Sequence, residues 1–190
     1  MGIQTFEEVL TAATTDGPVN TTGTRASCIP VANRIVLPNN YFYVGKTLKF
    51  TMSGRISSVI TTPGTARYDI DMGSAGTTIV FDSLAILLDS VAAHTTVAWF
   101  MEVILVCRAI GTGTSTTFFP AKATWTSEDI LGVPATAPKG VLTATLPWNT
   151  APAVGAGMDN TAASAVDVFF TQTAATGSHT VHSYVLEALN

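Results

Sequence analysis

The chain has 190 residues, enough for one domain of ordinary size with a substantial apolar core. Hydrophobic residues make up 47% of it and charged residues only 12%, against about 25% in typical soluble domains. The net charge of −4 and the scattered Lys and Arg residues argue against nucleic acid as a partner. The sequence has no apolar run as long as a membrane helix and no secretory signal pattern, so we expect no membrane partner.

The clearest helix pattern lies in residues 1–13. Thr5 and Glu8 are spaced as a capping box, and the apolar side chains of Phe6, Val9 and Leu10 follow at helical spacing. A helix this short is marginal alone, so its apolar face should dock on its own domain or on a neighbouring subunit. Together with the polar, turn-rich residues 14–24, this pattern predicts an N-terminal arm over 1–24.

From residue 25 to residue 190 the sequence alternates between strand patterns and turn signals. The cleanest strand lies within 46–60, where Leu48, Phe50, Met52 and Ile56 share one face and polar residues share the other. The run 97–110 is apolar on both faces, which predicts burial between two layers. Residues 84–91 are ambiguous between helix, strand and irregular structure. Further strands are expected at 32–37, 65–72, 77–81, 116–126, 141–146, 165–172 and 179–189. The pattern predicts one all-β domain over 25–190, an antiparallel sandwich or barrel.

Few residues suggest a metal site. The three histidines are His94, His179 and His182, and the last two point to opposite faces of the expected final strand. Nothing in the sequence supplies three or four converging nitrogen or sulfur ligands, so we predict no transition metal and no other cofactor. Asp69 and Asp71 share one strand face and could hold Ca²⁺ with further oxygens, although a solvated strand face is the favoured interpretation.

Catalytic patterns are likewise missing from the sequence. We find no nucleophile elbow and no phosphate-binding loop, and we predict that the protein is not an enzyme. Cys28 and Cys107 fit neither a zinc motif nor a CxxC pair, and buried free thiols are the default expectation. Core packing is the expected role of the strand aromatics Trp99, Phe100, Phe118, Phe119, Trp125, Phe169 and Phe170.

Several segments resemble a family of tailed-bacteriophage virion proteins. They are 37–50 (LPNNYFYVGKTLKF), 54–57 (GRIS), 62–65 (TPGT), 102–114 (EVILVCRAIGTGT) and 182–190 (HSYVLEALN). The resemblance runs from about Asp16 to the end of the sequence. It lies in the sequences of strands and turns rather than in catalytic motifs. It implies a jelly-roll fold, no enzymatic activity and, in many such proteins, a trimer.

The resemblance leads to a functional expectation. A capsid decoration (cement) protein, bound as a homotrimer to the outer face of the head shell, fits a short single domain best. The alternative is a tail or head fibre, or a receptor-binding tip domain. The expected partners are the chain itself and the major capsid protein or other virion proteins, in a virion assembled in the host cytoplasm. Phe6, Val9 and Leu10 are then the possible capsid or subunit contact. The low charge content independently favours association, because apolar surface on a soluble domain usually marks an interface.

Overall fold

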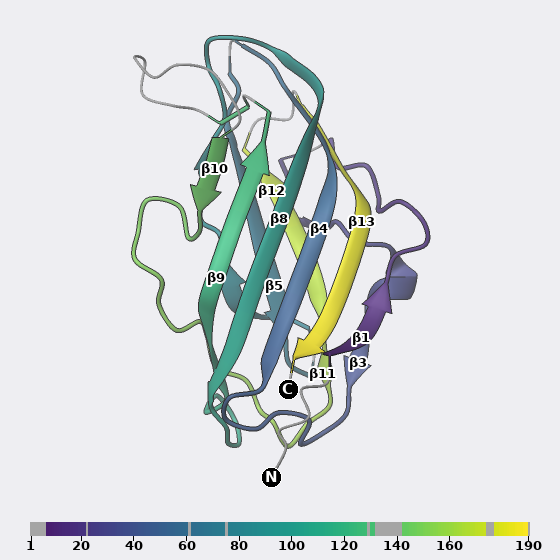
Figure 1. The fold of residues 1–190 in the computed structure, drawn as a ribbon, viewed down its shortest axis with the longest axis vertical. Helices are drawn as coiled ribbons and strands as arrows, with labels where there is room; N and C mark the ends of the chain where they lie inside the picture. The colour runs from purple at the N-terminus through teal and green to yellow at the C-terminus, as the bar shows by residue number, and fades with distance from the viewer. Residues whose placement is uncertain are drawn as a thin grey trace.

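Two antiparallel sheets packed face to face form the protein (Figure 1). The computed structural model describes residues 7–21, 23–60, 62–74, 76–128, 130–131, 142–173 and 177–189. The six-stranded sheet has the order β1 (Glu7–Ala12), β13 (Ser178–Leu189), β4 (Thr47–Ser58), β8 (His94–Ala109), β9 (Thr117–Ser127) and β10 (Leu142–Thr145). The second sheet has the order β2 (Ala26–Ser27), β12 (Asp167–Gln172), β5 (Thr65–Met72) and β6 (Thr78–Asp82), with β7 (Ile86–Leu87) also paired to β5. A 3₁₀ turn, η1 (Val31–Asn33), precedes a small pair made by β3 (Val36–Leu37) and β11 (Ser164–Ala165).

The topology is that of a jelly roll. Strands β1, β13, β4 and β8 lie side by side in one sheet, and β2, β12, β5 and β6 lie side by side in the other. The chain therefore crosses from one sheet to the other between β1 and β2, β2 and β4, β4 and β5, β7 and β8, β10 and β12, and β12 and β13, as two wound Greek keys require. The hairpin of β9 and β10 extends the first sheet at its β8 edge. The predicted fold class, an all-β antiparallel jelly roll, is confirmed.

Alternation along β4 builds the first layer of the core. Leu48, Phe50, Met52 and Ile56 are all buried, as the sequence pattern predicts. On β8 the prediction of burial on both faces is wrong, because only Trp99 and every second residue after it up to Cys107 are buried. The described chain has only two layers, so the outward face of β8 has no third layer to cover it.

The short N-terminal helix is also contradicted. Residues 7–12 form strand β1, which pairs with the last strand, and residues 1–6, including Thr5 and Phe6, lie outside the described part of the chain. The edge of β13 offers β1 a row of backbone hydrogen-bond partners, and a short helix, which is only marginally stable alone, gains less free energy than this pairing. Val9 consequently points outward, whereas Leu10 packs on the core beside a register shift between Val9 and Thr11.

The ambiguous stretch 84–91 resolves as the two-residue strand β7 within irregular chain. The final strand is paired on both sides, between β1 and β4, as its apolar sequence suggests.

The two cysteines are free and buried, as expected from the sequence. Burial raises the pKa of the Cys28 thiol far above its usual range and also raises the pKa of the Cys107 thiol. Because the thiolate is the reactive form, the folded protein is expected not to react with Ellman's reagent at pH 8, whereas unfolded protein in guanidinium should release the signal of both thiols. A full equivalent of rapid reaction in the native protein would contradict this arrangement.

Candidate binding surfaces

The three histidines do not come together. His179 is fully buried, whereas His182 reaches Asp16 through Nδ1 at 2.9 Å, so the predicted opposite faces are confirmed. His94 contacts Asp89, with Nε2 3.0 Å from Oδ2. In the part of the chain that the structure describes, no three His, Cys, Asp or Glu residues are grouped so that they could hold a metal ion.

Asp69 and Asp71 share the outer face of β5, as predicted, but this face is not solvated. Both carboxylates are buried, and the guanidinium of Arg25 lies between them, 2.8 Å from Asp69 Oδ2 and 2.6 Å from Asp71 Oδ1. Arg67 pairs with Asp69 and with Asp82, and Arg25 stacks on the ring of Phe169 at 3.8 Å. The Arg25 guanidinium supplies the positive charge that a Ca²⁺ ion would bring.

The buried carboxylates retain an electrostatic cost. Burial raises the pKa of Asp69 and of Asp71, although hydrogen bonds from Arg25 act in the opposite direction. Burial also raises the pKa of Asp167, which accepts a hydrogen bond from Ser27 at 2.6 Å. These groups are ion pairs within the sheet surface, and their arrangement is structural.

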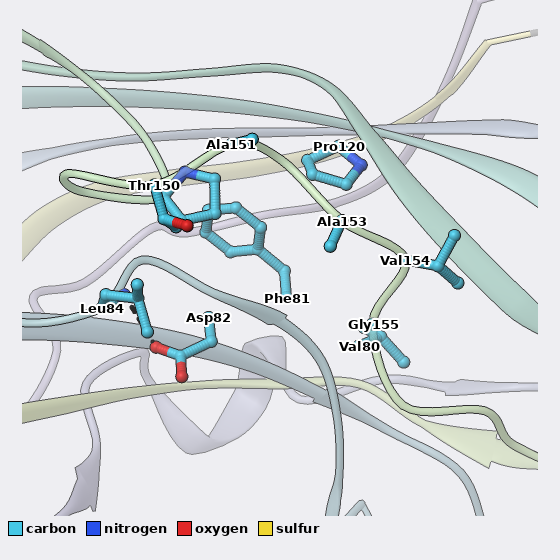
Figure 2. A pocket seen from close by; sticks show the side chains of 11 residues that line it. Val80, Phe81, Asp82, Leu84, Pro120, Thr150, Ala151, Ala153, Val154 and Gly155 are labelled. Atoms are coloured by element: carbon cyan, nitrogen blue, oxygen red, sulfur yellow. Dashed lines mark hydrogen bonds between the residues drawn. The ribbon is translucent and has the colours of Figure 1, made fainter.

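An apolar pocket of about 220 Å³ lies between the end of β6 and the segment 147–155 (Figure 2). In Figure 2, Ala151 and Ala153 lie on one side of it and Leu84 on the other. Its one charged side chain among the lining residues is Asp82, which is already paired with Arg67. The pocket can accept an apolar group, but its lining presents no nucleophile paired with a base.

A second hollow, of about 340 Å³, lies on the outer face of the six-stranded sheet. Phe100 stands in it with 62% of its surface exposed, although its neighbour on β8, Trp99, is fully buried. The residues around it are short and hydroxylic. We call this hollow the hydroxyl groove; its hydroxyl-bearing residues are Thr51, Ser53, Thr124, Thr126 and Ser183.

Strand register sets the arrangement of the hydroxyl groove. Ser53 on β4 and Thr126 on β9 lie directly opposite Phe100, and Ser183 on β13 lies opposite Ser53. In the next row, Glu102 lies between Thr51 and Thr124. Glu102 pairs with Lys122 across the strands, so the lining carries no unbalanced charge.

A third surface lies at the edge strand β1. Val9 is 56% exposed, Val31 on η1 is 72% exposed and Val36 on β3 is 66% exposed. Asn33 donates a hydrogen bond from Nδ2 to Thr11 Oγ1 at 2.8 Å, which holds η1 against β1. We call Val9, Val31 and Val36 the edge patch. The sequence pattern named Val9 as a contact, but Leu10 is turned inward and Phe6 is outside the described residues.

Sequence reasoning placed all the strand aromatics in the core, and this is correct for four of them. Trp99, Phe118, Trp125 and Phe170 are buried, Phe119 and Phe169 are half-buried, and Phe100 is exposed. The signal for Phe100 was its adjacency to Trp99, because successive side chains on a strand point to opposite faces.

Comparison with protein-family models, with curated proteins and with solved structures found no match in any of the three. Among the described residues, no helix has the length and apolar character needed to cross a membrane.

Proposed function

We propose that this chain is a structural protein of a bacteriophage particle, a decoration protein that binds the outer face of the head shell as a homotrimer. The edge patch is the observation that carries the proposal. Edge strands with exposed apolar residues invite association unless charges or covering segments protect them. Here β1 is paired on one side only, with β13, and the exposed Val9 follows two exposed glutamates on it. The exposed Val31 and Val36 lie on η1 and β3, in the segment that Asn33 ties to Thr11 of β1.

The jelly roll and the resemblance to tailed-phage virion proteins support the same proposal. A closed ring of three subunits would cover the edge patch of each and leave no free copy of that contact for further growth. The number three comes from the resemblance, and the expectation of association comes from composition and surface.

The oligomer is tested by replacing Val9 and Val31 with lysine in one variant. Light scattering of the wild type should give about three times the chain mass of 19.8 kDa, and the variant should give the mass of one chain. Lysine at an edge opposes pairing, because a charge must then be desolvated at the interface. The matched control is Val91→Lys, since Val91 is 60% exposed in the loop after β7, away from the edge patch. The control should remain trimeric.

Two results would contradict the oligomer proposal: a wild-type monomer at high micromolar concentration, or an oligomer unchanged in the double variant. Circular dichroism of the variant should stay strand-dominated, which separates lost association from lost folding.

Placement on a particle is tested by imaging phage with labelled antibody. Label spread over the whole head supports a decoration protein. Label confined to the tail or to fibres supports the alternative of a fibre or receptor-binding tip domain, which the exposed aromatic ring in the hydroxyl groove favours. Particles without label would overturn both.

A further inference from the structure

We propose that the hydroxyl groove is a binding site for a neutral saccharide, with Phe100 as its stacking platform. The inference does not depend on the oligomer or on the place of the protein in a particle. The phenyl ring of Phe100 is left 62% exposed on a strand whose opposite face, with Trp99 and Met101, is buried in the core.

The surroundings of Phe100 explain its exposure. On an outer sheet face, an aromatic side chain normally packs against its cross-strand neighbours, which lie about 5 Å away. The neighbours of Phe100 are Ser53 and Thr126, with Ser183 one strand further, and these side chains are too short to cover a phenyl ring. The exposed ring therefore lines a hollow of about 340 Å³, a volume within the usual range of small-ligand sites.

The chemistry of the lining fits a sugar. A pyranose presents C–H groups on its ring faces and hydroxyls around its rim. The negative face of an aromatic ring attracts such C–H groups, and Ser and Thr hydroxyls can both donate to and accept from sugar hydroxyls. Thr126 Oγ1 lies 3.0 Å from Thr143 Oγ1, and this hydrogen bond holds the Thr126 hydroxyl in one orientation. Short side chains on paired strands lose little conformational entropy when they bind a ligand.

The charge balance selects the class of saccharide. Glu102 is the charged residue of the lining, and it is paired with Lys122. An anionic sugar would be repelled by the Glu102 carboxylate, and Lys122, which is paired with Glu102, would not be free to bind the sugar. A protein partner fits less well, because the core of a protein interface is a continuous apolar patch, whereas Phe100 is a single ring among hydroxyls.

The groove and the edge patch can operate together. In the six-stranded sheet, β13 and β4 separate β1 from β8, which places the edge patch roughly 14 Å from the row of Phe100 at about 4.8 Å per strand. Association through the β1 edge would leave the groove open to solvent.

Saturation-transfer NMR with a panel of saccharides tests the site. The neutral probes are cellotetraose, maltotetraose and chitotriose, and the acidic probe is a uronic acid oligomer. At least one neutral probe should bind with a dissociation constant on the order of millimolar, as expected for a shallow site. Phe100→Ala should weaken that binding about tenfold or more, and Phe100→Trp should preserve or strengthen it. Thr126→Val, which keeps the shape but removes the hydroxyl, should weaken it about fivefold.

Leu87→Ala is the matched control, because Leu87 is also an exposed apolar residue but lies on β7 of the other sheet. It should leave binding unchanged. The proposal is overturned if no neutral probe binds, if the acidic probe binds more tightly than all neutral ones, or if Phe100→Ala leaves binding intact. Loss of the oligomer in Phe100→Ala would instead assign the ring to a protein interface and also overturn the saccharide site. Loss of the oligomer in the edge-patch variant alone leaves the saccharide site standing.

Discussion

Replacement of His179 by phenylalanine is expected to stabilise the protein against unfolding by about 3 kcal/mol more at pH 4 than at pH 8. His179 lies fully buried between two rings, stacked on Phe170 at 3.8 Å and on Trp99 at 5.1 Å between ring centroids. Within the described chain, neither ring nitrogen has a hydrogen-bond partner. Burial lowers the pKa of His179 from 6.5 to about 3, and the nearby His182 adds to this effect.

The direction of the pH effect follows from proton binding. Above pH 6.5 the imidazole is neutral in both folded and unfolded chains, so it contributes no pH dependence. Between about pH 6.5 and pH 3 the unfolded chain binds a proton that the folded chain does not, so stability falls as the pH falls. Phenylalanine removes this proton site and retains a flat ring for the stack. The buried carboxylates titrate in both proteins, so their effect cancels in the comparison.

The measurement is urea unfolding of wild type and His179→Phe at both pH values. Val181→Ala is the control, because Val181 is buried on the same strand and has no titratable group. It should lower the free energy of unfolding by the same amount at pH 4 and pH 8. Equal pH slopes for wild type and His179→Phe would show that His179 is not held neutral by its burial.

Replacement of Arg25 by alanine is expected to cost about 3 kcal/mol of stability at pH 8. The carboxylates of Asp69 and Asp71 have side chains only 1% exposed, and the Arg25 guanidinium bonds to both. Arg25 itself is about one-third exposed, so the expected cost lies at the low end for a broken buried ion pair. Arg25→Ala also removes the stack on Phe169.

The cost should decrease in acid. Burial already raises the pKa of Asp69 and of Asp71, and removal of Arg25 takes away the hydrogen bonds that oppose this rise. When a carboxyl group has a raised pKa in the folded state, the free energy of unfolding of the protein falls as the pH rises from the ordinary pKa to the raised one. The difference between Arg25→Ala and wild type should therefore be smaller at pH 4 than at pH 8.

Arg55→Ala is the matched control, because Arg55 is an exposed arginine on the outer face of β4. It should change the free energy of unfolding by less than about 0.5 kcal/mol at either pH. A cost for Arg25→Ala as small as that of the control would mean that water, and not Arg25, compensates the two carboxylates.

The sequence by itself determined the layers of this protein. Polar and apolar residues alternate along β4, and on a strand this pattern allows only one buried face. The turn signals between the strands gave the approximate bounds of the longer strands from β4 onward, although not the short strands β2, β7 and β11. The scattered histidines and cysteines indicated buried or isolated groups. Such features depend on neighbours along the chain, so they can be derived from local periodicity.

Only the tertiary structure decided the features that depend on distant partners. Residues 7–12 have a helical pattern, but the free edge of β13 turned them into a strand. Asp69 and Asp71 look like a solvated strand face until Arg25, more than forty residues away, bonds to both. Phe100 belongs to an apolar run, yet the described part of the chain places no third layer over it and sets Ser53 and Thr126 beside it. In each case the deciding contact joins residues far apart in sequence, and local pattern carries no information about which of them will meet.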